Sequence, residues 1–307
     1  MFEFGSSGTT VSCNPPVSCT IGSEPYIVLI ICGFGFKIAS VPFQMWVPDV
    51  YEGAPTPVTA YLSVASKAAG FAVISRILLT AFGMPEWLHT DWAMIIAVLA
   101  AITMTVGNVT ALLQTNIKRM LGYSSIAQAG YLMVGLAAMG MGPQVSDTVR
   151  SGLLFFLLSY TLTNLGAFIA IIAISNKINS DQIDDYTGMG KRAPLMALAL
   201  TLCMVSLTGL PPTAGLIAKI YIFSGAVNQG LLWLVIIAVI NSCISAYYYF
   251  RVVKVMWMGE PASEDKVTSS WPEWLAIALC CIPVVIIGVL PGAFIALTQG
   301  ASALFGI

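Results

Sequence analysis

The stretch FKIASVPFQMWVPDVYEGAPTPVTAYLSVASK, residues 36–67, has a lysine near each of its ends. The apolar residues continue on both sides, so Lys37 and Lys67 each fall in the middle of a segment long enough to cross a bilayer. Pro42 follows Lys37 by five residues and frees a carbonyl one turn back, because proline has no N–H. The stretch predicts membrane helices that carry charge, the first of them broken.

The whole chain has the composition of a membrane protein. Of its 307 residues, 58% are hydrophobic and 9% are charged, whereas soluble domains carry about 25% charged residues. So few charges cannot cover a water-facing surface. The net charge of -1, with no interleaving of aromatic and basic residues, excludes a nucleic-acid partner.

Segment lengths predict an all-α, polytopic integral membrane protein, an antiporter-like inverted-repeat bundle with two broken helices. A hydrocarbon core needs about 20 apolar residues of helix, which divides the chain into a polar segment over 1–24 and a membrane domain over 25–305. The eight predicted spans are 25–50, 57–82, 91–114, 119–140, 148–175, 194–227, 230–257 and 274–298.

The cations in the connections predict the orientation. Eight lysines and arginines are assigned to the connections after spans three, five and seven. The connections on the opposite side hold only Arg150. Because cytoplasmic loops are rich in Lys and Arg, both termini are predicted outside. The eight are Lys118, Arg119, Lys177, Lys191, Arg192, Arg251, Lys254 and Lys266.

Three lysines, Lys37, Lys67 and Lys219, lie within predicted spans. A lysine at the bilayer centre costs about 2.5–3.5 kcal/mol. Desolvation disfavours the charged form of an amine, so such a lysine can exchange a proton near neutral pH. Snorkelling or pairing with a carbonyl is the alternative for each; for Arg76, near the outer end of span two, snorkelling is the expected explanation. The three lysines together favour a proton or ion relay.

A second helix break is predicted beside Lys219, where Gly209, Pro211, Pro212 and Gly215 follow one another closely. Non-helical backbone at membrane depth survives where it is buried in protein or lines a water cavity. Spans one and six run in opposite directions, which is typical of inverted repeats around a site near the midplane. The residues assigned to breaks and gating are Pro42, Pro48, Asp49, Glu52, Pro211 and Pro212, and those assigned to the polar lining are Ser66, Ser125 and Gln128.

Four strings resemble one family in the same order over roughly residues 25–300. They are the opening stretch, GNVTALLQTNIKRMLGYSSIAQAGY (107–131), SLTGLPPTAGLIAKIYIF (206–223) and SAYYYFRVVKVMWMGEP (245–261). They resemble subunit N of bacterial complex I, together with its mitochondrial equivalent, subunit 2, and its chloroplast equivalent. The resemblance implies fourteen helices in two inverted five-helix repeats, with discontinuous seventh and twelfth helices.

The resemblance also implies a proton path along a row of lysines. Lys37, Lys67 and Lys219 match lysines of the seventh, eighth and twelfth helices, so the chain corresponds to helices seven to fourteen and lacks the first six. The glutamate that the family carries on its fifth helix has no counterpart, and some relatives have histidine in place of Gln128. A half-channel is therefore expected here, and an independent pump is not.

The expected function is that of a proton-translocating membrane subunit of a complex I-type NADH–quinone, or ferredoxin–quinone, oxidoreductase. No cofactor is expected on this chain, and the resemblance assigns NADH, FMN, iron–sulfur clusters and quinone to partner subunits. The expected partners are a neighbouring antiporter-like subunit, small helical subunits and the lipid of a bacterial plasma membrane rather than a thylakoid membrane. Two alternatives stay open: a subunit of a multisubunit cation/proton antiporter, and a truncated structural subunit that does not conduct.

The predicted orientation is testable at the 177–192 connection. We expect a cysteine placed at Ser180 to react with a membrane-impermeant maleimide added from the cytoplasmic side, because this connection carries three of the cations. Labelling of right-side-out and inverted vesicles, in a chain without its other cysteines, measures this. Reaction only from the periplasmic side would reverse the orientation.

Overall fold

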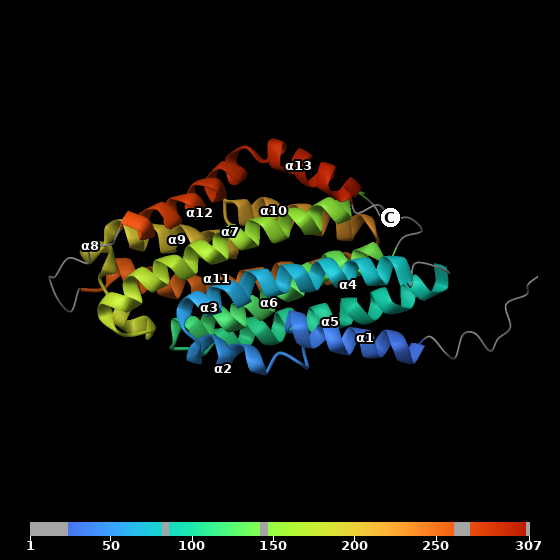
Figure 1. The fold of residues 1–307 in the computed structure, drawn as a ribbon, viewed down its shortest axis with the longest axis horizontal. Helices are drawn as coiled ribbons and strands as arrows, with labels where there is room; N and C mark the ends of the chain where they lie inside the picture. The colour runs from blue at the N-terminus through green and yellow to red at the C-terminus, as the bar shows by residue number, and fades with distance from the viewer. Residues whose placement is uncertain (1–23, 82–85, 142–146, 261–270, 305–307) are drawn as a thin grey trace, which may run out of the picture.

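The computed structural model describes residues 24–81, 86–141, 147–260 and 271–304, and within these ranges the chain is helical, with no strand. The long helices run side by side along one axis of the bundle (Figure 1). In chain order they are α1 (Glu24–Ile38), α2 (Trp46–Gly53), α3 (Thr56–Tyr61), the π-helical η2 (Leu62–Ser66), α4 (Lys67–Ala81), α5 (Glu86–Leu112), α6 (Ile117–Met139), α7 (Asp147–Ile178), the 3-10 turn η3 (Ile183–Tyr186), α8 (Met189–Arg192), α9 (Pro194–Thr208), α10 (Ala214–Asn228), α11 (Leu232–Met258), α12 (Trp271–Val289) and α13 (Pro291–Leu304).

The predicted helix breaks are present. The first separates α1 from α2 over residues 39–45 and contains Pro42, and the second separates α9 from α10 over residues 209–213. Both breaks contain a cis X-Pro bond. In Figure 1, α1 begins at the end where α13 finishes, and α9 begins at the opposite end beside α8, so the two broken helices run in opposite directions.

The last predicted span differs from the structure. The range 274–298 was expected to be one helix, but α12 ends at Val289 and α13 starts at Pro291. Proline has no N–H, and its ring clashes with the carbonyl one turn earlier, so the helix cannot pass this point without a bend. Figure 1 shows α13 turning away from the direction of α12.

Five helices in the described ranges are long and apolar enough to cross a membrane. They are Thr56–Thr80, Trp92–Leu112, Asp147–Ile178, Leu232–Met258 and Trp271–Val289. The other three predicted spans correspond to the two broken helices and to α6. The number of eight crossings stays a prediction, and the polar segment over 1–24 lies outside the described residues apart from Glu24.

Ion pairs gather at the end of the bundle where α2 and α8 lie (Figure 1). Lys118 Nζ lies 2.7 Å from Asp181 Oδ2, and Arg119 pairs with Glu52 at 2.7 Å and with Asp49 at 3.3 Å. Burial, and then the charge of Asp181, raise the pKa of the Tyr186 hydroxyl. These contacts join α2, α6 and the connection after α7 at the end predicted to be cytoplasmic.

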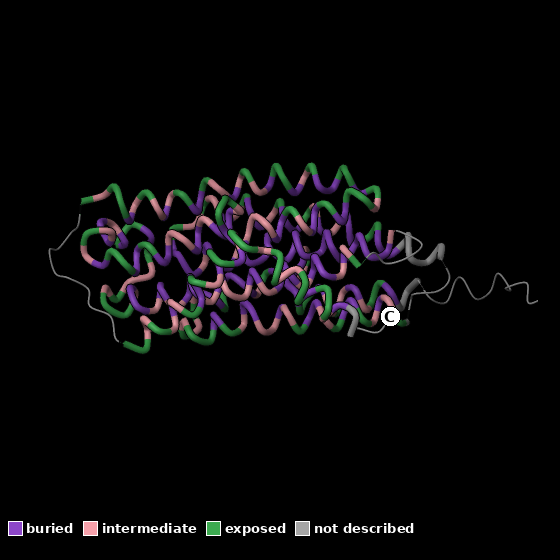
Figure 2. The backbone as a smooth tube through the Cα atoms, turned by 90° about the horizontal axis from the view of Figure 1, so that it is seen from above, coloured by how far each residue is buried: buried purple, intermediate pink, exposed green. Residues whose placement is uncertain are grey.

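Helix α6 forms the centre of the bundle, and nearly all of its residues are buried. Figure 2 shows the buried backbone running through the interior, with exposed residues along the outer helices. Glycines let α5 approach it closely: a Cβ on Gly130 would lie 2.7 Å from Met104 N, and one on Gly107 would lie 2.7 Å from Ala127 N. Small residues at helix crossings are a usual means of close packing in membranes.

We expect Gly130→Ala to lower the free energy of unfolding by about 1–3 kcal/mol, because the added methyl group would overlap the α5 backbone. Denaturant or thermal unfolding in detergent measures this. Gly33→Ala is the matched control, since nothing lies within 4 Å of a Cβ built there. Equal stability of both variants would show that α5 can move away from α6 at little cost.

Candidate functional site

The end of α9 presents two backbone carbonyls that have no partner within their own helix. Leu207 O and Thr208 O would each accept from the N–H four residues later, but those positions are Pro211 and Pro212. Gly209, with a φ of +87°, turns the chain out of the helix. The two prolines therefore leave a pair of acceptors inside the bundle.

Lys219, one helical turn into α10, is bonded to these carbonyls. Its Nζ lies 3.1 Å from Leu207 O, 2.7 Å from Thr208 O and 2.9 Å from Ser242 Oγ. An ammonium group has three donors, and these three acceptors satisfy all of them. The ammonium also lies 4.9 Å from the centre of the Tyr131 ring, at cation–π distance.

The close contact of α9 with α10 depends on Gly215. Its backbone N–H donates to Ser206 Oγ at 3.3 Å, and a Cβ at this position would lie 1.8 Å from Ser206 O. On the outer side of the break, a Cβ on Gly288 of α12 would lie 2.4 Å from Pro212 O. Backbone therefore contacts backbone on two sides of the break.

Lys67 lies in a second buried polar cluster. Its Nζ donates to both the carbonyl and the hydroxyl of Ser125 on α6. The same hydroxyl contacts Tyr51 OH at 3.2 Å and accepts from Tyr160 OH at 3.1 Å. Lys67 directly follows the π-helical turn η2, and such turns are frequent at functional sites.

A small cavity lies beside Lys219 and extends to Tyr160, whose hydroxyl bonds to Ser125 of the Lys67 cluster. It measures about 10 Å³ and is lined by Tyr160 on the Lys67 side and by Gln128 and Lys219 on the other. This is about the smallest volume that holds one water molecule. Lys67 and Lys219 are 3% and 5% exposed, so both amines are shut off from the surface of the chain.

A third polar cluster begins at Tyr131, beneath Lys219. Asn108 Nδ2 donates to Tyr131 OH at 3.1 Å and to Asn241 Oδ1 at 3.2 Å, and Tyr248 OH donates to Asn108 Oδ1 at 2.9 Å. All four side chains are buried. Polar groups thus extend from Lys219 into the junction of α5, α6 and α11.

The other predicted site residues lie in several separate parts of the structure. Lys37 is exposed on α1, its stem next to Gly70, and Ser66 is only half-buried and lies outside the bonded clusters. Gln128 donates to Leu207 O at 3.1 Å. Pro48 is buried in α2, while Asp49 and Glu52 are paired with Arg119 at the bundle end.

Sequence analysis missed the tyrosines and asparagines of these clusters. They are Tyr51, Asn108, Tyr131, Tyr160, Asn241 and Tyr248. An asparagine inside a predicted span was the available signal, because an amide in hydrocarbon needs partners. Among the described residues, no group of three His, Cys, Asp or Glu side chains lies close enough together to hold a metal ion.

The fold and site define a class. A helical membrane bundle with two broken helices of opposite direction, and with lysines held in its interior, is an antiporter-like membrane domain. Residues 20–245 match the family described as NADH:quinone oxidoreductase/Mrp antiporter, TM. The chain belongs to this family.

Curated relatives named NADH-quinone oxidoreductase subunit N are similar to most of this chain. Subunit N of NADH-quinone oxidoreductase from Dehalococcoides mccartyi is 52% identical over 278 residues, which cover 91% of this chain and 57% of that protein. Subunit N from Heliobacterium modesticaldum is 45% identical over 307 residues, which cover 98% of this chain and 63% of that protein. The chain spans about three fifths of the length of these relatives.

Solved structures share the fold. A chain of respiratory complex I from Thermus thermophilus with bound aureothin matches with a TM-score of 0.74 and 32% identity, over 88% of this chain and 58% of that one. A chain of the Mrp complex from Dietzia matches with a TM-score of 0.79 and 19% identity, over 91% and 59%. The second likeness is one of fold alone.

We expect Asn108→Leu to lower the free energy of unfolding by about 2 kcal/mol, because it leaves Tyr248 OH and Tyr131 OH without their buried partner. Unfolding in detergent measures the change. Asn176→Leu, the same substitution at an exposed position of α7, is the control and should change stability by less than about 0.5 kcal/mol. Equal changes in the free energy of unfolding for the two variants would show that the cluster does not stabilise the fold.

Proposed function

We propose that this chain is a proton-translocating membrane subunit of an NADH–quinone oxidoreductase. The observation that carries the proposal is the set of bonds from Lys219 to the two carbonyls left free by Pro211 and Pro212. They hold an ammonium group inside the bundle while the cavity beside it leads toward Tyr160 and Lys67. The 52% and 45% identities to proteins named subunit N support this branch over a cation/proton antiporter.

The proposed path runs between the two buried lysines. A proton leaves Lys67 through Ser125 and Tyr160 and crosses the cavity on a water molecule to Lys219. Because Tyr160 donates to Ser125 in the structure, both hydroxyls must turn for transfer in this direction, and each of them can donate and accept. Two ammonium groups in one low-dielectric interior repel each other. The arrival of a proton at one lysine therefore favours its release from the other.

The release step follows from the bonding of Lys219. The neutral amine has two donors and one lone pair, so it can donate to Leu207 O and Thr208 O but no longer to Ser242 Oγ. Its lone pair can accept from the Ser242 hydroxyl, which donates to Thr208 O in the structure, so release of the proton requires this hydroxyl to turn. A charge change supplied from outside this chain is then needed to drive each cycle, and we assign it to a neighbouring membrane subunit.

Lys37 has a different place in the proposed path. Its side chain is exposed on α1, next to the first break, so we assign it to proton exchange with another polypeptide of the complex. The redox cofactors NADH, FMN, iron–sulfur clusters and quinone are assigned to partner subunits. The eight predicted segments cross the plasma membrane of a bacterium, with both termini outside.

We expect Lys219→Met and Lys67→Met to slow proton translocation by the assembled complex about 100-fold, the usual contribution of one positioned proton-transfer group. Methionine fills a similar volume and removes a buried charge, so insertion and assembly should persist. Proton uptake per electron transferred, measured in proteoliposomes, tests this. Lys254→Met, at an exposed position, is the control. Normal pumping by both interior variants would exclude the relay.

A further inference from the structure

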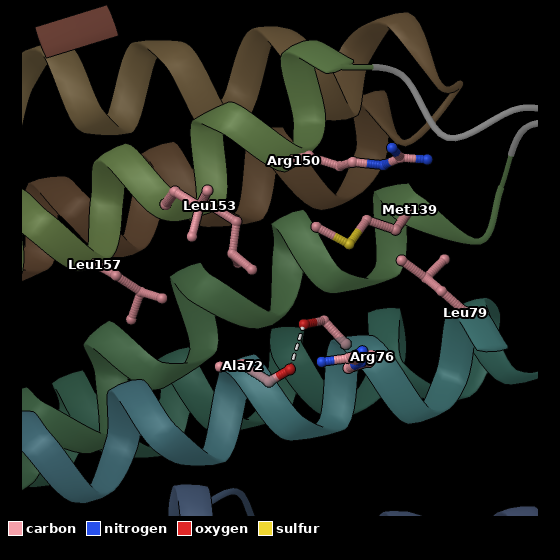
Figure 3. Close-up of a pocket in the computed structure, with 9 residues that line it drawn as sticks. Ala72, Arg76, Leu79, Met139, Arg150, Leu153 and Leu157 are labelled. Carbon is pink, nitrogen blue, oxygen red and sulfur yellow. Dashed lines mark hydrogen bonds between the residues drawn. The ribbon is translucent and has the colours of Figure 1, made fainter. Parts of the chain in front are cut away.

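An open groove is lined by residues of α4, α6 and α7 (Figure 3). In Figure 1 the end of α4 and the start of α7 lie at the end of the bundle opposite to α8. The cavity of the groove measures about 40 Å³ and is open to the outside. Its walls are mainly aliphatic and include Leu79, Leu153, Leu154 and Leu157. Figure 3 shows Arg76 on the α4 wall and Arg150 on the α7 wall, with Met139 between them.

The groove results from the way one long helix packs. Its first part, α3 and η2, contacts α7, whereas its continuation, α4, contacts α1 and α6 instead. The two walls therefore separate toward the outer end, and the α6 residue Met139 forms the floor. The opening lies on the surface of the bundle, where Arg76 is exposed.

The two arginines of the groove have little compensating charge. Arg150 Nη1 lies 3.9 Å from Asp147 Oδ1, and the Asp147 side chain is 88% exposed, so this ion pair is weak. Arg150 Nε is enclosed by protein and has no hydrogen-bond acceptor in the described part of the chain. Among the acids whose side chains the structure describes, none forms an ion pair with Arg76. An enclosed N–H group without an acceptor is costly and favours a ligand that supplies one.

The combination of guanidinium groups and aliphatic walls fits a ligand that has both an anionic group and an apolar chain. A guanidinium group presents paired donors that fit two oxygens of a phosphate, and basic pockets between membrane helices bind anionic headgroups. The leucines of the walls fit an acyl chain. Among the described side chains, the two cations have one weakly paired acid nearby, which favours a headgroup with net negative charge over a zwitterionic one, whose own cation would be repelled.

We propose that this groove is a binding site for an anionic phospholipid of the outer leaflet, with its phosphate held by Arg76 and Arg150 and an acyl chain lying along Leu153, Leu154 and Leu157. The site is separate from the lysine clusters and does not depend on the proposed proton path.

Native mass spectrometry of the purified 307-residue chain, loaded with phosphatidylglycerol or with phosphatidylcholine of the same acyl chains, tests the headgroup. We expect phosphatidylglycerol to be retained about tenfold more strongly than phosphatidylcholine. Each of Arg76→Gln and Arg150→Gln should weaken the retention of phosphatidylglycerol by about tenfold, which corresponds to one charge-assisted contact. Lys191→Gln, which removes an exposed cation at the opposite end, should change nothing. Equal retention of the two lipids, or equal loss in all three variants, would overturn the proposal.

The acyl chain is tested separately. Leu154→Trp fills the apolar wall and keeps both arginines, so it should also weaken phosphatidylglycerol about tenfold. Glycerol phosphate, which carries the headgroup charge without acyl chains, should fail to displace the lipid at equal concentration. Displacement by glycerol phosphate would show a site for a free phosphate, and undiminished lipid binding by Leu154→Trp would show that the groove is not where the lipid lies. Either result overturns the proposal.

Discussion

The bonds between Lys219 and the end of α9 reconcile two features that are each unfavourable in a membrane. A broken helix leaves carbonyls without donors, and a lysine in the interior needs acceptors. Pro211 and Pro212 free two carbonyls, and the ammonium group of Lys219 bonds to both. Each feature supplies hydrogen-bond partners to the other, and Gln128 and Ser242 donate to the same two carbonyls, so the break keeps donors even without the lysine.

The rest of the interior is arranged around this pair. Ser206 reaches the first turn of α10, Gln128 shares Leu207 O with the lysine, and Tyr131 places its ring beneath the ammonium. Lys67 has no proline-freed carbonyl and bonds instead to Ser125 of the continuous helix α6. The two lysines are therefore held by different means, one at the end of a broken helix and the other on the side of a continuous one.

Much of this fold was predictable because proline acts locally. The prolines marked both breaks, and composition alone established a membrane bundle. The division of α12 from α13 at Pro291 obeys the same rule, but the apolar run continues across it and hid the signal. The site was predictable only in part, because the exposure of Lys37 and the tyrosines around Ser125 depend on which helix faces meet. When a span is apolar on nearly every side, its sequence does not indicate which face packs against a neighbouring helix.

The contact of Gly288 with Pro212 has a mechanical consequence. The outer side of the second break contacts the backbone of α12 directly at Gly288, with no side chain between the two segments. Movement of the loop between α9 and α10 toward α12 would therefore push directly on backbone close to the bend at Pro291. Such a displacement would also reach α13, which packs against α7 beyond that bend.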